Sequence, residues 1–231
     1  MNKLNYRKSL LLLKLIIALF FVSCSVNQSP RISLEFNGNI KSYFERIYKT
    51  KKESGNWQKG EIEDYGHFFK KFDKNGNFTT IHQLDKENKL LRKILSVQEN
   101  GKIVEEITYD KEGKREGVIK INHINRNQTN SESFDVNGNK VNGTMFRKNG
   151  KRTKYIHMRN DELEHVSLWK YDKKGKLTSQ KVTNKKGEII LNNKFEYLEF
   201  DLQNNWTRKL IYKDGDDYPQ NIVIREIQYY Q

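Results

Sequence analysis

The sequence predicts an all-β protein: an extended antiparallel β-meander of hairpin repeats that forms a single twisted sheet, preceded by an N-terminal signal-peptide helix. Two observations predict this fold. Turn-forming residues recur at a nearly constant spacing over residues 72–215, and the stretches between them are rich in β-branched and aromatic residues. In addition, no sustained helical apolar stripe with capping residues occurs after residue 23.

Residues 1–23 have the layout of a secretory signal peptide. Basic residues come first, at Lys3, Arg7 and Lys8. An apolar run from Leu10 to Val22 follows, interrupted only by Lys14. This run is shorter than the roughly 20 apolar residues that a helix needs to cross a bilayer. A cleaved signal peptide is therefore favoured over a membrane-spanning anchor.

The apolar run ends in Phe21-Val22-Ser23-Cys24, which resembles the lipobox of bacterial lipoproteins, and in its aromatic Phe21 the Bacteroidetes type. The resemblance implies cleavage between Ser23 and Cys24 and a diacylglycerol on the Cys24 thiol. Cys24 is the only cysteine of the chain, so it has no partner for an intrachain disulfide. More than one acyl chain gives stable anchoring.

This anchor sets the expected organisation of the chain. Residues 24–30 form a polar tether, and residues 31–231 form the β-repeat domain. The protein is expected in the bacterial cell envelope. Ser25 after the cysteine resembles the residue at this position in enteric lipoproteins that are sorted to the outer membrane, which implies that destination.

A turn motif, aromatic-Asp-x-x-Gly-Asn/Lys, recurs along the chain. Its glycine position, or an asparagine in its place, falls at residues 76, 88, 101, 113, 138, 150, 175 and 187, in steps of 12 or 13 or twice that. Asp opens such a turn by accepting backbone N–H groups, and Gly or Asn then adopts the left-handed conformation. The predicted turn positions are Asp73, Gly76, Gly101, Asp110, Gly113, Asp135, Gly138, Gly150, Asp172, Gly175, Gly187 and Asn204.

Alternation between apolar and polar residues is imperfect on the predicted strands. On one strand, Ile103, Ile107 and Tyr109 share a face with Glu105. A closed barrel or a two-layer sandwich is expected to show a cleaner inward row. The pattern therefore favours an open sheet stabilised by cross-strand pairs. A sandwich stays open as an alternative, with residues 31–71 folded back over one face.

The Tyr/Phe-Asp-x-x-Gly-Lys/Asn units resemble the YD-type repeats of RHS proteins and the related MORN-like variant repeats, over roughly residues 72–215. A further copy at residues 200–208, followed by residues 225–230, looks like the ends of Bacteroidetes repeat lipoproteins. The resemblance implies strand–turn–strand units of bacterial surface and antitoxin-like proteins. It implies little about activity.

The chain is strongly basic, with a formal net charge of +14. Four of its 43 basic residues precede Cys24, which leaves 39 basic and 29 acidic residues in the remainder. Such a surface can lie against anionic lipid headgroups or polyanions. The basic residues are spread along the chain, which argues against a nucleic-acid footprint. A well-solvated, lysine-rich surface is the simplest interpretation.

No residue pattern predicts a catalytic, cofactor or metal site. The five histidines are His67, His82, His123, His157 and His165, and no second cysteine is present to complete a zinc site. His157 and His165 are eight residues apart in a predicted strand–turn–strand, so they could be neighbours. Scattered surface or half-buried histidines remain the favoured interpretation.

The acidic and tryptophan residues also have simple interpretations. The loop at residues 73–77 lacks the glycine spacing of an EF-hand and is read as a turn. The cluster at residues 214–217 is either a weak calcium site or, as favoured, a solvated hairpin loop. The carboxylate pairs Glu105/Glu106 and Glu61/Asp64 suit an ordinary charged sheet. One interpretation of Trp57, Trp169 and Trp206 is a stripe that binds a carbohydrate or a peptide. The favoured interpretation is that these rings pack on the sheet.

Together these features predict a lipid-anchored cell-envelope protein with a non-enzymatic binding or scaffold role. The predicted partners are the membrane, through lipid on Cys24, and an envelope protein, a glycan or a toxin, but not nucleic acid. One alternative is an immunity or antitoxin-like lipoprotein that neutralises a toxin. A second alternative is an envelope enzyme that acts on glycans.

Overall fold

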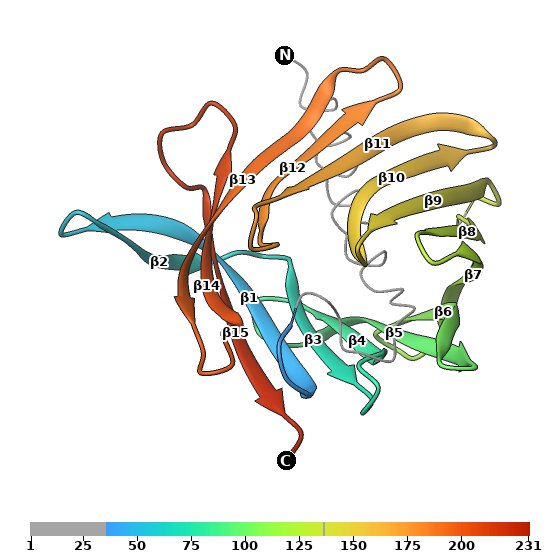
Figure 1. Cartoon of the computed structure of the whole chain (residues 1–231), viewed down its shortest axis with the longest axis horizontal. Coiled ribbons are helices and arrows are strands. Elements are labelled where there is room, and N and C mark those ends of the chain that lie inside the picture. Colours follow the sequence, from blue (N-terminus) through green and yellow to red (C-terminus); the bar gives the residue numbers. More distant parts are fainter. Residues whose placement is uncertain (1–35, 136) are drawn as a thin grey trace.

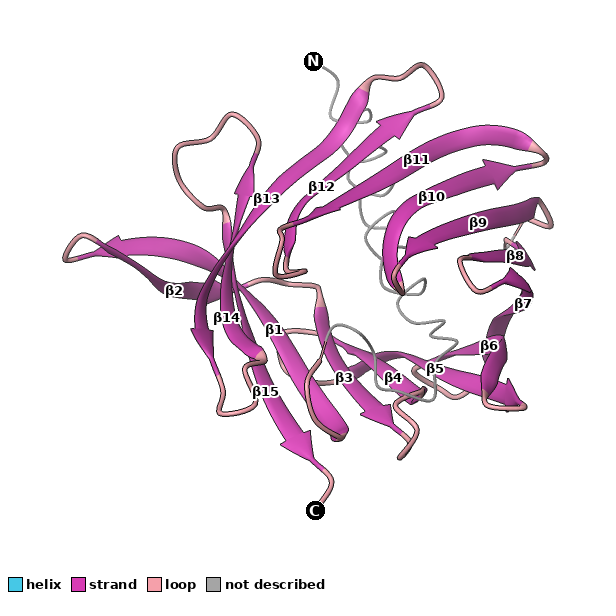
Figure 2. Cartoon of the chain, in the orientation of Figure 1, coloured by secondary structure: helices cyan, strands magenta, loops and turns pink. Residues whose placement is uncertain are grey.

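The computed structural model of the protein describes residues 36–231 except Val136. The predicted signal peptide with its helix, the cleavage site, the lipid-attachment residue Cys24 and the tether lie outside these residues. All regular secondary structure in the described part is β-strand (Figure 2). No candidate membrane-spanning helix occurs in that part.

Fifteen strands follow one another along the chain. They are β1 (Ile40–Glu53), β2 (Asn56–Ile62), β3 (His67–Phe72), β4 (Phe78–Leu84), β5 (Leu90–Glu99), β6 (Lys102–Asp110), β7 (Arg115–Asn125), β8 (Gln128–Phe134), β9 (Lys140–Lys148), β10 (Lys151–Arg159), β11 (Glu162–Tyr171), β12 (Leu177–Asn184), β13 (Ile189–Phe200), β14 (Trp206–Lys213) and β15 (Asn221–Tyr229). All the pairings between them are antiparallel.

The sheet closes on itself. From β3 to β15 each strand pairs with the next, β1 pairs with β3, and β1 also pairs with β15 between Ile40↔Tyr229 and Lys49↔Asn221. The blue β1 accordingly lies beside the red β15 in Figure 1. The result is a 14-stranded barrel, with β2 paired only to the far half of β1. The prediction of an all-β antiparallel meander is confirmed, but the prediction of an open, single twisted sheet is wrong.

The closure also removes the sandwich alternative for the described residues. Within residues 31–71, the part from residue 40 onward forms β1, β2 and most of β3, which belong to the same sheet as the other strands. These residues do not form a second layer over one face.

The open-sheet prediction failed because the inward face of this barrel is chemically mixed. On β1 the inward row consists of Tyr43, Glu45, Ile47 and Lys49, all of which line one interior cavity. Barrel diameter grows with strand number, and wide barrels leave room inside that side chains do not fill. A clean apolar inward row is therefore not required for closure.

The chain reverses at residues of the turn motif. In the β3–β4 turn, Oδ1 of Asp73 accepts hydrogen bonds from the N–H groups of Asn75 and Asn77, both at 2.9 Å, and Gly76 has a φ of 82°. Asp110, Asp135 and Asp172 accept backbone N–H groups in the same way. Positive φ also occurs at the other predicted turn residues, Gly101, Gly113, Gly138, Gly150, Gly175, Gly187 and Asn204.

Two-residue turns occur at other reversals of the chain. Asn100 and Gly101 both have positive φ, as do Asn149 and Gly150. This is the geometry that matches the right-handed twist of paired strands. The twist therefore accumulates from hairpin to hairpin. The sheet curves as a result, and its last strand, β15, pairs with its first, β1.

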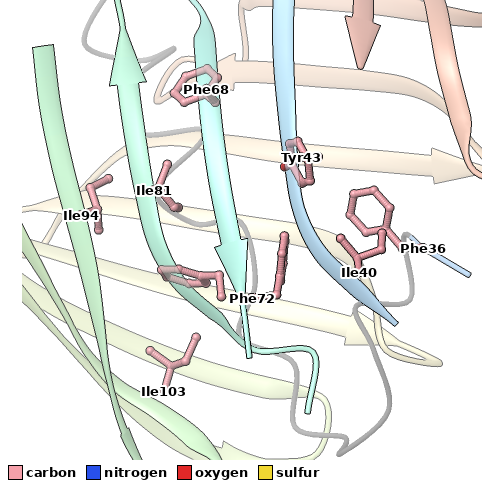
Figure 3. Packing of buried hydrophobic residues seen from close by; sticks show 9 residues of the cluster. Phe36, Ile40, Tyr43, Phe68, Phe72, Ile81, Ile94 and Ile103 are labelled. Carbon is pink, nitrogen blue, oxygen red and sulfur yellow. The ribbon is translucent and has the colours of Figure 1, made fainter. Parts of the chain in front are cut away.

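A hydrophobic cluster fills one part of the barrel interior, on the side of β1 and β3–β6 (Figure 3). Its buried members are Phe36, Ile40, Tyr43, Phe68, Phe72, Phe78, Ile81, Ile94 and Ile103. The rings of Phe36 and Tyr43 are 5.2 Å apart, and those of Tyr43 and Phe72 are 5.8 Å apart. Each fully buried side chain of this size stabilises the fold by about 1.5–3 kcal/mol, so this cluster holds the first strands together.

Gly143 of β9 gives a test of interior packing. A Cβ at this position would overlap the Tyr155 hydroxyl and lie 2.6 Å from Oγ of Ser131. We expect Gly143→Ala to lower the free energy of unfolding by about 1–3 kcal/mol, the usual cost of overpacking, as measured by urea denaturation. Gly117→Ala is the matched control, because no atom lies within 4 Å of its added Cβ. Equal destabilisation by both substitutions would contradict the packing described here.

Candidate functional site

The barrel encloses a cavity of about 1130 Å³, which we call the lumen. It is lined by β1, β3 and β9–β15 together with several of their turns. The hydrophobic cluster forms part of its wall, since Phe36, Tyr43, Phe68 and Phe72 belong to both. Small-molecule sites commonly measure about 300–1,000 Å³, so the lumen has room for a ligand of several rings.

The lumen wall is strongly basic. Ten of its side chains are lysine or arginine, and only two, Glu45 and Glu63, are acidic. A concave wall that carries one sign of charge focuses the electric field and concentrates counter-ions. The lumen therefore favours negatively charged occupants.

The lumen wall is also aromatic, with twelve Phe, Tyr or Trp side chains. Six of the basic groups lie over ring faces. The pairs and their distances to the ring centroid are Lys70–Tyr43 (5.7 Å), Lys151–Tyr171 (5.4 Å), Arg152–Trp169 (5.3 Å), Lys176–Phe200 (3.7 Å), Lys209–Trp206 (4.3 Å) and Arg225–Trp206 (3.6 Å). A ring face attracts a cation through its quadrupole and thereby orients the basic group.

One ion pair crosses the closure seam inside the lumen. Arg225 of β15 and Glu45 of β1 are register partners, and Nε and Nη2 of Arg225 donate to Oε2 of Glu45 at 3.0 and 2.7 Å. Both side chains are buried. Burial acts to raise the pKa of Glu45, but the attraction of Arg225, together with Lys209 and Lys70, outweighs it and lowers that pKa. Glu45 therefore stays ionised and holds Arg225 in place over the Trp206 ring.

Two arginines face each other on neighbouring strands. Arg147 of β9 and Arg152 of β10 are register partners, and both line the lumen. Burial, and then the repulsion of Arg152, lower the pKa of Arg147 to about 10. Like charges placed directly across a sheet are destabilising. An anion between the two guanidinium groups would relieve this repulsion.

The three tryptophans do not form one stripe. Trp169 and Trp206 line the lumen, whereas Trp57 does not. The Trp57 ring lies 6.4 Å from that of Tyr218. Only two of the three rings are therefore placed to contact an occupant of the lumen.

The histidines fall into two groups. His157 and His165 are register partners whose rings stack at 4.4 Å and 12°. Burial, and then the neighbouring His157, lower the pKa of His165 to about 4.

The other three histidines lie apart from this pair. Nδ1 of His67 accepts a hydrogen bond from the Ile47 N–H, and Nε2 of His123 lies 2.8 Å from the Ile103 carbonyl oxygen. The His82 ring packs 6.0 Å from that of Phe69.

The acidic clusters have protein partners. Asp214 pairs with Lys194 at 2.9 Å, and Asp216 accepts a hydrogen bond from Gln220. Glu61 and Asp64 are exposed, and they pair with Lys49 at 3.4 Å and Lys86 at 2.9 Å respectively. Glu105 and Glu106 are consecutive on β6, and Glu106 is buried while Glu105 is half-buried.

Sequence reasoning missed the convergence of basic residues. Lys70 is far along the chain from Lys209 and Arg225, and each looks like a member of an ordinary charged strand. They meet because each lies on the inward side of its strand in the closed barrel. The register of every strand must be known before this pattern can be seen.

No family model matches the chain, and no curated protein matches it. Among solved structures, the chain is similar to a porin-like protein from Bacteroides vulgatus, with 10% identity, a TM-score of 0.41 and coverage of 84% of this chain and 99% of that one. A porin-like protein from Bacteroides uniformis has 10% identity, a TM-score of 0.35 and coverage of 83% and 99%. A LolA superfamily protein from Nitrosomonas europaea has 8% identity, a TM-score of 0.30 and coverage of 89% and 92%. At these TM-scores we base no conclusion about function on the similarities.

Proposed function

We propose that the protein is a lipid-anchored, non-enzymatic binding protein of the bacterial cell envelope whose lumen holds an acidic oligosaccharide. The observation that carries this proposal is the composition of the lumen wall, with ten basic against two acidic side chains. The facing pair Arg147 and Arg152 is its most specific feature.

The charge of the wall supports an anionic ligand. Arginine donates paired hydrogen bonds to carboxylate and phosphate oxygens, and such charge-assisted bonds are stronger than neutral ones. Of the two acidic side chains, Glu45 is neutralised by Arg225. The wall therefore keeps a net positive charge that a carboxylate- or phosphate-bearing ligand would balance.

The uncharged side chains of the wall favour a sugar-like ligand and not a hydrocarbon chain. Eight asparagine or glutamine side chains line the lumen, and their amides both donate and accept hydrogen bonds, as hydroxyl groups require. Trp169 and Trp206 add flat ring surface to this wall. The apolar side chains of the wall are mostly aromatic, twelve against six aliphatic, so flat ring faces make up most of its apolar surface.

The state of the two lining carboxylates supports binding over catalysis. Acid–base catalysis needs a group that is available to give or take a proton. Glu45 is held in a buried ion pair, and Glu63 accepts a hydrogen bond from Nδ2 of Asn221 at 2.8 Å. Both carboxylates are thus engaged by neighbouring side chains of the lumen wall.

Ligand binding is tested by calorimetric titration of the purified chain with a hexameric uronic-acid oligosaccharide, with a neutral hexamer of the same linkage as control. We expect binding of the acidic hexamer that weakens with added salt. The Lys176→Gln/Lys209→Gln variant should weaken it tenfold or more, since hydrogen bonds to charged groups contribute about 1.5–3 kcal/mol each. Lys120→Gln/Lys154→Gln, at two exposed positions on the strands, is the matched control.

Two outcomes would overturn this assignment. Equal loss of binding in the lumen variant and the control variant would show non-specific attraction to a basic surface. Binding of anionic lipid vesicles but not of either oligosaccharide would replace the glycan with a lipid.

The anchor is tested separately by growth with labelled palmitate. We expect label on the wild-type chain and none on Cys24→Ser, which should also leave the membrane fraction. Equal labelling of the two chains would remove the lipid anchor from the proposal and leave the lumen untouched.

A further inference from the structure

A second cluster of chemically active side chains lies at a β-bulge between β10 and β11. The pairing runs from His157↔His165 to Met158↔Leu163, so Glu164 is an extra residue on β11 with no partner on β10. A bulge interrupts the alternation of side chains and re-aims the extra one. Glu164 thereby comes together with His165, its neighbour in sequence, and with His157 across the strand pair.

The three side chains present their ligand atoms to one small space. One nitrogen from each imidazole and one carboxylate oxygen all lie within 4.8 Å of one another. Nε2 of His157 is 2.9 Å from Oε2 of Glu164, and the two imidazole rings are stacked. Ligand atoms about 2.1 Å from a tetrahedral ion are roughly 3.4 Å apart, so modest side-chain shifts bring the three groups round one ion.

The state of His157 points to a missing partner. Its side chain is fully buried, and Nδ1 has no hydrogen-bond partner among the described residues. Nε2 has only the contact with Glu164, at 2.9 Å. Buried polar groups are nearly always hydrogen-bonded, so an exception of this kind calls for an explanation.

We propose that His157, Glu164 and His165 bind a divalent transition-metal ion, with Zn²⁺ as the first candidate. Two imidazoles and one carboxylate are a ligand set that suits zinc and its neighbours, whereas Mg²⁺ and Ca²⁺ prefer oxygen ligands alone. Three protein ligands leave one tetrahedral position for water or for another ligand.

The surroundings orient the carboxylate. Nε of Arg159 is 3.5 Å from Oε1 of Glu164, and Nη1 of Arg159 is hydrogen-bonded to Oδ2 of Asp135. Oε1 is thus held by the arginine, and Oε2 is left facing His157. The Glu164 side chain is 37% exposed, which gives an ion a path from solvent. The positive charge of Arg159 weakens metal binding somewhat, and Asp135 offsets part of that effect.

The proposed metal site is separate from the lumen. None of its three residues lines that cavity. It joins β10 to β11 close to the turn at Asn160 and Asp161, so a bound ion would cross-link this hairpin. Failure of the glycan proposal would leave the metal proposal standing, and the reverse also holds.

The test uses the full chain with Cys24→Ser, which removes the only thiol, after treatment with a chelator. We expect ZnCl₂ titration to show one ion per chain by calorimetry and by elemental analysis, together with a higher melting temperature. Co²⁺ in place of Zn²⁺ should give the visible absorption of a four-coordinate site. MgCl₂ should give neither signal.

Variants decide whether the triad is responsible. His157→Gln and Glu164→Gln should each weaken Zn²⁺ binding at least tenfold, and Glu164→Gln, at a half-exposed position, is expected to fold. His82→Gln is the matched control, because His82 lies far along the chain and packs beside Phe69. Unchanged zinc affinity in Glu164→Gln, or equal loss in His82→Gln, would overturn the proposal, as would the absence of stoichiometric binding.

Discussion

Arg225→Met is expected to lower the free energy of unfolding by about 3–5 kcal/mol, because it leaves the Glu45 carboxylate buried without its partner. Arg225 and Glu45 are only 6% and 5% exposed, and they are joined by two hydrogen bonds across the seam between β15 and β1. Arg225 also stacks on Trp206 at 3.6 Å, so the variant loses packing as well as charge.

Urea denaturation at neutral pH measures this effect. The double variant Glu45→Gln/Arg225→Met should recover much of the loss, because no charge is then left alone in the interior. Glu199→Gln provides the matched control, since it breaks a more exposed pair with Arg208 that we expect to contribute less than about 1 kcal/mol. If Arg225→Met and Glu199→Gln lowered the free energy of unfolding by similar amounts, water would have to reach the seam between β15 and β1, which would contradict this prediction.

The Glu45–Arg225 pair also makes the free energy of unfolding depend on pH under acidic conditions. The pKa of Glu45 is lowered in the folded protein, so its stabilising contribution is complete above its unfolded value of about 4.5. That contribution is lost as the pH falls through the lower folded pKa. Arg225→Met should lack this part of the acid-induced loss of stability.

Glu106→Gln is expected to stabilise the protein at alkaline pH. Glu106 is 2% exposed, and its Oε2 atom has no hydrogen-bond partner. Burial raises its pKa from 4.5 to about 8, and the attraction of Lys70 offsets only part of that shift. The folded state therefore holds a proton that the unfolded state releases between about pH 4.5 and 8, so stability falls as the pH rises through this window.

The size of this effect follows from the shift. At about 1.36 kcal/mol per pKa unit, the wild-type protein should lose up to about 5 kcal/mol relative to Glu106→Gln between pH 4.5 and pH 9. Urea denaturation of both proteins across this range gives the difference directly. Glu105→Gln, which alters the preceding and more exposed residue, should keep the wild-type dependence. A Glu106→Gln curve parallel to that of the wild type would show that the carboxyl is hydrated.

The turns were predictable because their chemistry is local. Asp73 and Gly76 are three residues apart, and the hydrogen bonds that define their turn involve nearby backbone groups. The spacing of such turns was enough to predict successive antiparallel strands. This part of the fold needed no knowledge of distant contacts.

Closure could not be predicted in the same way. The pairing of β1 with β15 joins residues that are 180 positions apart in the case of Glu45 and Arg225. Neither strand carries a signal that distinguishes it from its neighbours. The mixed inward row also resembles that of an open sheet, because part of the barrel interior is a lumen lined by charged and polar side chains as well as apolar ones.

Bulges explain why the facing of individual side chains was misread. Ile103 is 1% exposed and Glu106 is 2% exposed, although regular alternation would send them to opposite faces. The register on this strand shifts near Ile103. A slip of one residue reverses the facing of every side chain beyond it. The lumen residues and the bulge at Glu164 were hidden for this reason.

Closure of the barrel is the claim on which the lumen depends, and a designed disulfide measures it most directly. Phe44 of β1 and Glu226 of β15 are register partners, and directly opposed strand residues lie within the distance range that a disulfide needs. In a Cys24→Ser chain, Phe44→Cys/Glu226→Cys is expected to form an intrachain disulfide under mild oxidation, seen as a faster band on a non-reducing gel and as a loss of 2 Da by mass spectrometry. Phe44→Cys/Lys154→Cys, on strands that are not paired, should remain reduced. A reduced Phe44/Glu226 pair in the folded protein would contradict closure, since the two edge strands of an open sheet lie far apart.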